Sequence, residues 1–285
     1  MSGAPSPPSG PVPVLPRRPG PTVRVRVTEQ HAEGERSRED RVATEEPLEI
    51  RVAEPGRPAR RAWVTMRTPG HDFELAAGFA VHEGIVDPTD LRQVAYCTDV
   101  ALSPQEQFNV VTLTVARPVE LPDRSAATSA GSSACGVCGK ESVEAALSIR
   151  HAPRWTGELP TAAVLRALPG ALRSRQPVFG RTGGVHAAGL ADSSGELLVV
   201  REDVGRHNAV DKVTGARVLA GLPSAEACLV VSGRAGFELV QKAVVAGVGM
   251  LAAVGAPTSL SVRLAREHGL GLVGFTSPDR AVRYV

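Results

Sequence analysis

Apolar and polar residues alternate along several stretches of the first half of the chain, and this pattern predicts β-strands. Valines alternate with arginines over Thr22–Thr28, which is typical of an edge strand. Further short strands are predicted over Leu48–Val52, Ala62–Met66 and Phe108–Val115. An acidic start, apolar residues on one face and a terminal glycine predict a helix over Asp72–Glu83. The almost wholly polar stretch His31–Arg41 is predicted to be a loop, so residues 22–121 form a strand-rich N-terminal domain in this prediction.

The hydrophobic pattern of the second half of the chain is different: apolar strand-like runs alternate with helical patterns. The strand-like runs are Val185–Leu190, Leu197–Val200, Ala227–Ser232, Met250–Val254 and Leu270–Phe275. The helical patterns are Asn208–Leu219, Phe237–Ala246 and Ser259–Glu267. Alternation of this kind predicts an α/β fold with a mainly parallel sheet flanked by helices, and residues 141–285 as a ligand-binding domain.

Polar residues gather directly after the predicted strands, where sheets of this kind bind their ligands. The four segments are Glu202–His207, Ser232–Arg234, Ala256–Ser259 and Thr276–Arg280. Arginines, hydroxyls and glycines in front of helix N-termini suit an anionic, phosphate-bearing ligand. Any one segment could be a plain loop with a helix cap, since Ser, Thr and Asp are common caps. Four segments on one edge favour a binding site, with His207, Ser232 and Arg234 as candidate contacts.

Two of the four cysteines, Cys135 and Cys138, form a C-x-x-C motif at a point where the apolar pattern stops. Residues 122–134 are small and polar, which predicts a flexible cysteine loop over residues 122–140. A helix is predicted directly after it, over Glu141–Ile149. Free backbone N–H groups at a helix N-terminus lower the pKa of a cysteine, so this position suits a reactive thiolate.

The motif alone leaves several chemistries open. A structural zinc site needs four ligands, and neither Cys97 nor Cys228 has a near partner, so no metal is expected. Cys228 is expected to be a small apolar residue of a buried strand. A thioredoxin-like redox pair normally belongs to a compact βαβ unit, whereas this motif follows a small-residue segment in mid-chain. In a sulfur carrier, one thiolate holds a sulfane sulfur as a persulfide and a second thiol releases it by exchange. Two inert residues in a turn are the remaining alternative.

Composition narrows the class of protein. The chain has 285 residues, 42% of them hydrophobic, so a globule with a sizeable core is expected. Aromatic residues make up 4% and the net charge is +2, which argues against a nucleic-acid-binding protein. Seven prolines in residues 1–20 predict a disordered tail over residues 1–21, or alternatively a proline-rich ligand for a partner. No secretory signal and no bilayer-spanning apolar run are visible, so a soluble, cytoplasmic protein without membrane contact is expected.

Lysine is rare among the basic residues. Of the 32 lysines and arginines, three are lysines: Lys140, Lys212 and Lys242. All three lie beside the polar segments or the cysteine motif, where the tunable pKa of a lysine would be useful.

Several longer stretches resemble the formate dehydrogenase accessory sulfurtransferases, the FdhD family. The cysteine loop SACGVCGKESVEA carries the first of these likenesses. The others are TEEPLEIRV at 44–52, PGHDFELAAGFAVHEGI at 69–85, RTGGVHAAGL at 181–190, EDVGRHNAVDKV at 202–213, SGRAGFELVQKA at 232–243, GAPTSLSVRLA at 255–265 and LVGFTSPDRAVRY at 272–284. The resemblance spans residues 22–284 and departs at Gly236, where the family pattern has serine.

The resemblance implies a sulfur carrier that acts between a cysteine desulfurase and the molybdenum cofactor destined for formate dehydrogenase. It implies that Cys135 forms the persulfide, with Cys138 as its companion. The family's cofactor-contacting segment matches Phe275, Thr276, Ser277, Pro278, Asp279 and Arg280. The implied acceptor is a molybdenum bis(molybdopterin guanine dinucleotide), and the implied fold is a cytidine-deaminase-like, layered α/β domain without the deaminase zinc. A homodimer is implied as well. A cofactor-binding chaperone without sulfur chemistry is the alternative that the same residues allow.

Overall fold

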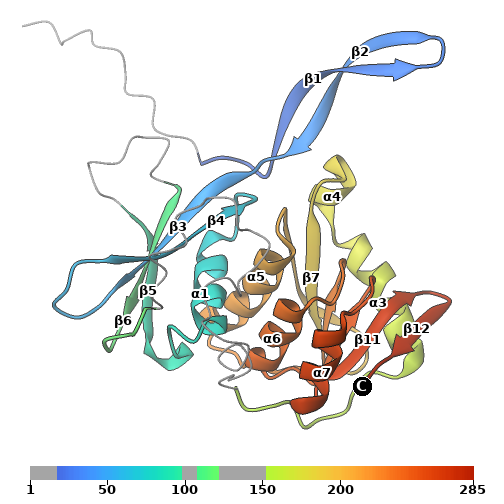
Figure 1. Ribbon diagram of the computed structural model, residues 1–285. Helices are drawn as coiled ribbons and strands as arrows, with labels where there is room; N and C mark the ends of the chain where they lie inside the picture. Colours follow the sequence, from blue (N-terminus) through green and yellow to red (C-terminus); the bar gives the residue numbers. More distant parts are fainter. Residues whose placement is uncertain (1–17, 98–107, 122–151) are drawn as a thin grey trace, which may run out of the picture.

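The computed structural model of the chain describes residues 18–97, 108–121 and 152–285. These residues form a mixed α/β structure with three separate sheets (Figure 1). The predicted α/β class is therefore confirmed, whereas the cytidine-deaminase-like layering and the domain boundaries stay predictions. The cysteine loop, the helix predicted over 141–149 and residues 1–17 of the predicted tail lie outside the described residues.

The first two strands form a long hairpin that projects from the rest of the molecule (Figure 1). We call this hairpin, residues 22–43, the arm. In it β1 (Thr22–His31) pairs antiparallel with β2 (Gly34–Ala43) along its whole length. The predicted edge strand is confirmed, but the loop predicted over residues 31–41 is wrong, because most of that range is β2. The two faces of the arm carry few buried side chains, so β2 needs no apolar pattern, and cross-strand ion pairs such as Arg38 to Glu29 at 3.2 Å support it instead.

A four-stranded sheet with one covering helix follows the arm. Its strands lie in the order β4-β3-β6-β5, with a 3₁₀ turn η1 (Pro88–Asp90) before β5. Their bounds are β3 (Glu46–Ala53), β4 (Arg60–Arg67), β5 (Leu91–Tyr96) and β6 (Val110–Val115). Helix α1 (Asp72–His82) buries Leu75 and Phe79 in the same cluster as Ile50 and Leu113 of the sheet. The three strands and the helix predicted here are confirmed, and β5 was not predicted.

The six-stranded sheet of the second half has the order β12-β11-β10-β9-β7-β8. Its strands are β7 (His186–Ala191), β8 (Leu197–Asp203), β9 (Cys228–Val231), β10 (Met250–Ala253), β11 (Gly271–Ser277) and β12 (Arg280–Arg283). Strand β10 pairs parallel with β9 and β11, whereas β7 pairs antiparallel with β8 and β9, and β12 with β11. The prediction of a mainly parallel sheet is therefore wrong. Strands β7 and β8, like β11 and β12, are joined by short turns, which allow antiparallel pairing, whereas parallel pairing needs a crossover.

Helices cover both faces of the six-stranded sheet. Helices α5 (Arg206–Leu219), α6 (Phe237–Ala246) and α7 (Ser259–Glu267) pack on one face, and α3 (Ala162–Ser174) packs on the other. The short helix α4 (Pro177–Thr182) connects α3 to β7. The three helices predicted in this half are confirmed, α6 and α7 with identical bounds.

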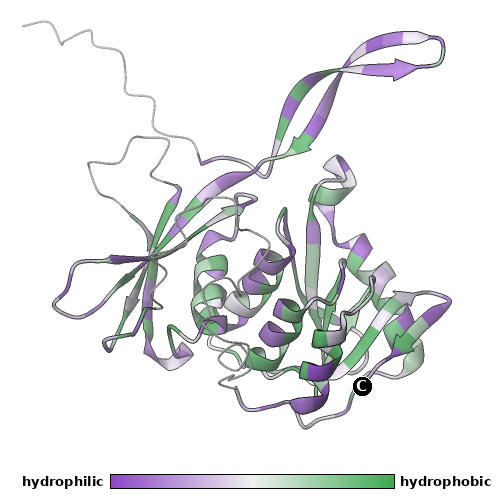
Figure 2. Cartoon of the chain, viewed as in Figure 1, coloured by the Kyte–Doolittle hydropathy of each residue, from purple (hydrophilic) through white to green (hydrophobic). Residues whose placement is uncertain are grey.

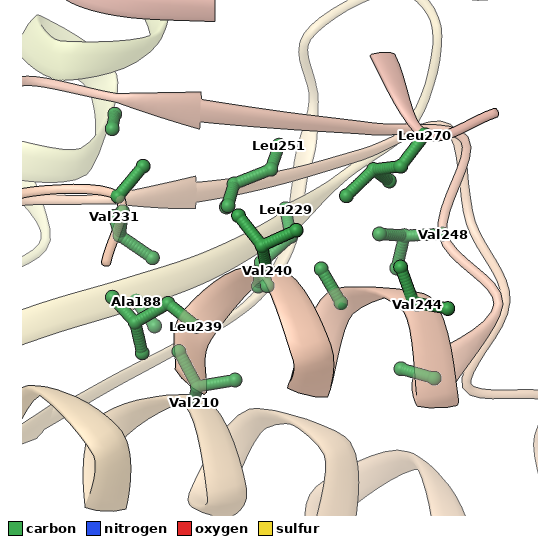
Figure 3. Packing of buried hydrophobic residues seen from close by; sticks show 14 of the residues in the cluster. Ala188, Val210, Leu229, Val231, Leu239, Val240, Val244, Val248, Leu251 and Leu270 are labelled. Carbon is green, nitrogen blue, oxygen red and sulfur yellow. The ribbon is translucent and has the colours of Figure 1, made fainter. Parts of the chain in front are cut away.

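The core of the six-stranded sheet follows the alternation of side chains along its strands. Leu229 and Val231 of β9 face Leu239 and Val240 of α6 (Figure 3). Cys228 and its neighbour Val230 lie in the cluster on the α3 side. Cys228 is fully buried, and burial raises the pKa of its thiol to about 12, so it is the apolar core residue that the sequence predicts. Figure 2 shows this hydrophobic interior beside the mainly hydrophilic arm.

The two larger sheets are joined through α1 and α5, which lie side by side (Figure 1). A Cβ atom added to Gly78 of α1 would overlap the backbone of Asp211, and one added to Gly215 of α5 would overlap the backbone of Glu74. Buried charges cross the same boundary: Lys212 Nζ lies 2.6 Å from Asp203 Oδ2 and donates to Thr68 O at 2.9 Å. We call the contact between α1 and α5, together with the buried charges beside it, the joint. Within the described ranges, no helix is long and apolar enough to cross a bilayer.

Candidate functional site

The carboxyl ends of four strands meet at one edge of the six-stranded sheet, which we call the carboxyl edge. Strands β9, β10 and β11 are parallel, and β8 runs in the same direction because β7 is antiparallel to both β8 and β9. Backbone contacts continue past the strands: Gly255 N donates to Gly233 O at 2.9 Å, and Phe275 N donates to Gly255 O at 3.1 Å. A strand spacing of about 4.8 Å puts the ends of β8 and β11 about 19 Å apart. The four polar segments predicted from the sequence thus lie along this edge.

The end of β11 presents a strained, exposed aromatic residue. Phe275 has a φ of 50°, in the left-handed region that non-glycine residues rarely adopt, and 41% of its surface is exposed. The pairing register of β11 with β12 shifts between Gly274 and Ser277, which places Phe275 in a bulge. The guanidinium carbon of Arg280 lies 5.1 Å from the centre of the Phe275 ring. The phenyl ring and the cation therefore form one small surface at the edge.

The remaining predicted residues of this segment complete the turn into β12. Pro278 and Asp279 form the two-residue turn, and Ser277 pairs with Arg280 across it. Thr276 points inward and is 1% exposed, and its hydroxyl oxygen has no hydrogen-bond partner among the described residues. A buried hydroxyl without a partner costs about 1–3 kcal/mol, so a ligand atom that reached it would gain a hydrogen bond.

The other predicted contacts lie at the ends of β8 and β9. Ser232 Oγ accepts a hydrogen bond from Ala187 N at 2.9 Å, and Arg234 is exposed. His207, in the first turn of α5, has its Nε2 atom 2.6 Å from a carboxylate oxygen of Glu238 in the first turn of α6. The structure therefore brings Ser232, Arg234 and His207 to the same edge as Phe275 and Arg280, but in two groups separated by the end of β10.

His186 is a residue of this edge that the sequence analysis did not select. It begins β7, and its Nδ1 atom lies 3.5 Å from Ser232 Oγ. Burial, together with the nearby positive charge of Arg206 and the neighbouring His207, lowers the pKa of His186 below its ordinary value, which favours the neutral ring at neutral pH. A parallel β7 would have placed this histidine at the opposite edge. The signal that could have located it is the short turn between β7 and β8, which dictates antiparallel pairing.

Two of the three lysines lie in the interior of the protein, where they pair with aspartates instead of facing the carboxyl edge. Lys212 is 1% exposed and pairs with Asp203, and Lys242 Nζ lies 2.7 Å from Asp211 Oδ1. Asp211 also accepts from His82 Nδ1 at 2.6 Å. Burial opposes ionisation of Asp211, but Lys242 and His82 outweigh it and keep the pKa of this carboxyl below its ordinary value. The suggestion that lysines mark the ligand site is therefore wrong for Lys212 and Lys242, which hold the joint.

Cys135 and Cys138 lie outside the described residues, so the structure does not place them relative to the carboxyl edge. The chain re-enters the described part at Ala152, whose N–H donates to Val245 O at the end of α6. This point lies at the opposite edge of the six-stranded sheet from Ser232 and Phe275. In residues 18–97, 108–121 and 152–285, no group of three or more histidine, cysteine or acidic side chains could hold a metal ion.

Comparisons with known proteins agree with one another. The sequence model of the FdhD/NarQ family matches residues 43–285, so its match begins at the last residue of the arm. The chain is 49% identical over 250 residues to the sulfur carrier protein FdhD of Streptomyces avermitilis, which covers 84% of this chain and 85% of the relative. It is 47% identical over 262 residues to the sulfur carrier protein FdhD of Mycolicibacterium paratuberculosis, and this alignment covers 90% of this chain and 94% of the relative.

A solved structure shows the same fold. The crystal structure of a candidate formate dehydrogenase accessory protein from Desulfotalea psychrophila superimposes with a TM-score of 0.72 at 25% sequence identity. The superposition covers 93% of this chain and 97% of the other. The likeness in sequence and in structure therefore extends over nearly the whole chain.

Proposed function

Because the chain belongs to the FdhD/NarQ family, we propose that it is a sulfur carrier that supplies sulfur to the molybdenum cofactor of formate dehydrogenase. The observation that carries the proposal is the 47–49% identity, over more than four fifths of the chain, to relatives named sulfur carrier proteins. The C-x-x-C motif supplies the thiols that such a role requires. The partners in this proposal are a cysteine desulfurase as donor and formate dehydrogenase as recipient of the cofactor, with the carrier acting in the cytoplasm as a homodimer.

The sulfur chemistry needs both cysteines of the motif. The thiolate of Cys135 attacks the outer sulfur of a persulfide on the desulfurase, which forms a new S–S bond on Cys135 and releases the donor cysteine as a thiolate. The thiolate of Cys138 then attacks the inner sulfur of the Cys135 persulfide. This step forms a Cys135–Cys138 disulfide and releases the outer sulfur, with its electron pair, as sulfide. A cellular dithiol reductant restores the two thiols.

The carboxyl edge is the place where we expect the acceptor to bind. The acceptor in this proposal is the molybdenum bis(molybdopterin guanine dinucleotide), which is cargo rather than a resident group. Its diphosphates would meet the N-termini of α5 and α6 and the guanidinium groups of Arg234 and Arg280. The exposed ring of Phe275 fits a ligand at this edge.

The position of Ala152 is compatible with this arrangement. Ala152 lies 17 positions after Cys135, and a chain of 17 steps spans at most about 56–61 Å. The longest strands of the six-stranded sheet have seven residues and a length of about 23 Å. Cys135 is therefore within reach of the carboxyl edge although its chain re-enters the fold at the other edge.

Sulfane sulfur on the protein tests the carrier role against the chaperone alternative. After incubation with a cysteine desulfurase and cysteine, we expect cold-cyanide-labile sulfur on the wild type and on Cys97→Ser, and none on Cys135→Ala. Cys138→Ala should load sulfur but release little sulfide. Equal loading of Cys135→Ala and wild type would contradict the assignment of Cys135, and an absence of loading on the wild type would favour a chaperone.

Nucleotide binding tests the carboxyl edge. Free GDP is expected to bind, and Arg280→Ala should weaken it about tenfold, because the loss of one charge-assisted hydrogen bond costs about 1.5–3 kcal/mol. Arg283→Ala, on the same strand, is the matched control. Titration calorimetry measures the affinities, and sulfur loading of Cys135 should be unchanged in both variants. Equal affinity of wild type and Arg280→Ala would remove Arg280 from the site.

A further inference from the structure

The arm, residues 22–43, is a two-stranded sheet that stands away from the rest of the molecule (Figure 1). Within the described ranges, neither of its outer edges pairs with a further strand. Val23 and Val42 lie directly opposite each other in its register and are 47% and 39% exposed. An isolated two-stranded hairpin is at best marginally stable in water, so an arm of this length needs a further contact to hold its structure. The match to the family model begins at residue 43, so family membership does not explain the arm.

The outer edge of β2 lacks the features that keep exposed strands apart. Proteins protect such edges with short strands, prolines, lysines or bulges. Strand β2 has ten residues, contains no proline or lysine, and pairs with β1 in an unbroken register. Every second backbone N–H and C=O group of β2 therefore points outward, where it is open to another strand.

The order of charges along β2 identifies a second copy of this chain as the strand that fits. Two copies of β2 placed antiparallel, with a twofold axis at Arg38, bring Glu35 opposite Arg41 and Arg36 opposite Asp40. Side chains alternate between the faces of a strand, and the members of each pair are an even number of positions apart, so each pair shares a face. Opposite charges directly across two strands stabilise the pairing, and the twofold axis repeats both pairs.

The ion pairs within the arm leave these charges available. The side chains of Arg36 and Arg41 form no ion pair with any residue in the described ranges. Arg38, which would meet its own copy at the axis, is already neutralised within the arm: its guanidinium lies 3.2 Å from Glu29 and 3.1 Å from Asp40. Two arms can therefore approach at this point without two uncompensated cations facing each other.

The outer edge of β1 does not have this property. Its charged residues are Arg24, Arg26 and Glu29. Glu29 lies on the opposite face of the strand from both arginines, because it is an odd number of positions away from each. Antiparallel copies of β1 related by a twofold axis therefore never place Glu29 directly opposite an arginine. The charge pattern thus favours β2 as the edge that pairs.

We propose that β2 pairs edge to edge and antiparallel with β2 of a second copy over residues 35–41, so that two arms form one four-stranded sheet. The homodimer is part of the proposed function, and this inference supplies its contact surface without depending on the sulfur chemistry. The paired stretch ends before Ala43, which lies beside Gly184 at the base of the arm. The contact is shorter than a standard interface, so we expect a dimer that dissociates on dilution.

Two complementary charge variants of the full-length protein test the pairing. Arg36→Glu/Arg41→Glu leaves four acidic and no basic residues at the paired positions, and Glu35→Arg/Asp40→Arg leaves four basic and no acidic ones. In sedimentation velocity experiments, each variant alone should show a dimer dissociation constant at least tenfold above that of wild type, because like charges then face each other. An equimolar mixture of the two should dimerise again, because every pair then unites opposite charges.

A matched control separates the position of the charges from their number. Arg61→Glu/Arg92→Glu makes the same change in net charge on exposed residues of the four-stranded sheet, and it should dimerise like wild type. Hydrogen exchange gives a second measurement that needs no substitution. The β2 amides that point away from β1 should exchange slowly only at concentrations of wild type at which the dimer forms.

Three results would overturn the proposal: a wild type that stays monomeric, arm variants that dimerise as tightly as wild type, or a mixture that does not recover together with β2 amides whose exchange is independent of concentration. Sulfur loading of Cys135 is measured on the same samples. Normal loading with failed pairing would remove the arm contact and leave the carrier role in place, whereas pairing without loading would do the reverse.

Discussion

Single residues at the carboxyl edge occupy positions that cost free energy in the ligand-free chain. Phe275 has a left-handed backbone, which costs a bulky residue about 1–3 kcal/mol, and the hydroxyl of Thr276 is buried without a partner. Costs of this kind are typical of binding sites, where a ligand supplies the missing contacts. Neither feature is visible in the sequence, because backbone angles and hydrogen-bond satisfaction depend on the tertiary environment.

The ionisation of a second residue, Glu74, should make the stability of the protein depend on pH. Burial alone would raise the pKa of its carboxyl, but hydrogen bonds from Arg201 and His71 outweigh burial and lower the pKa from 4.5 to about 2. Since the folded pKa lies below the unfolded one, the stabilisation is present above pH 4.5 and is lost as the pH falls toward 2. The pair is partly solvated, so we expect a loss of about 1–2 kcal/mol in the free energy of unfolding over this range.

Glu74→Gln should remove most of that pH dependence. Urea unfolding at pH 6 and pH 3 measures it, with Glu33→Gln at the tip of the arm as the control. If wild type and Glu74→Gln lost stability in parallel between these two pH values, the Arg201 contact would not be the cause.

At the scale of elements, the close approach of α1 and α5 depends on the absence of two side chains. Gly78 and Gly215 each face the backbone of the opposite helix, and a Cβ atom at either position would overlap a carbonyl oxygen. Glycine within a helix ordinarily costs about 0.5–1 kcal/mol relative to alanine. Here that cost is offset by packing of the two backbones, which brings the buried ion pairs of the joint together.

Alanine in place of a helical glycine ordinarily stabilises the helix, but at these two positions it should destabilise the protein. We expect Gly78→Ala and Gly215→Ala to lower the free energy of unfolding by about 1–3 kcal/mol, because the helices must separate to accept the methyl group. Gly170→Ala in α3 is the matched control: nothing lies within 4 Å of its added Cβ atom, so it should be neutral or stabilising by up to about 1 kcal/mol. Chemical denaturation of the three variants decides the matter, and equal effects at all three positions would argue against close packing at the joint.

The elements also show what hydrophobic patterning can and cannot predict. Helices α6 and α7 were predicted with their observed bounds because each has an apolar stripe that packs on the sheet. Strand β2 was missed because it packs on no core. The direction of β7 was missed because patterning reports which residues are buried and not how strands pair. The carboxyl edge was nevertheless located, since β8, β9, β10 and β11 run in one direction, whereas α3 and α4 have no counterpart among the predicted helices.

At the scale of the whole molecule, the joint couples the four-stranded sheet to the six-stranded one through buried charge. Lys212 contacts Asp203 and the carbonyl oxygens of Thr68 and Glu202, so one ammonium group connects both halves. Removal of one partner of a buried pair leaves the other unpaired, which costs about 3–5 kcal/mol. The two sheets are therefore expected to unfold together.

Calorimetry tests this coupling. Wild type should show one cooperative transition, and Lys212→Met should move the whole transition to lower temperature. The double variant Asp203→Asn/Lys212→Met should recover part of the loss, because it leaves no buried charge behind. Two resolved transitions in wild type, or an effect of Lys212→Met on part of the heat only, would show that the halves are independent.

The burial of Lys212 and Lys242 has a practical consequence for the chemistry of the folded chain. An amine-reactive ester must reach the side-chain nitrogen of a lysine, and both of these groups are buried and in contact with carboxylates. Acylation at either position therefore has to wait for the joint to open. Since the chain has only one other lysine, Lys140, a mass spectrum of the acylated protein would be simple to read. The rate at which Lys212 and Lys242 acquire the label would then measure how often α1 separates transiently from α5 under native conditions.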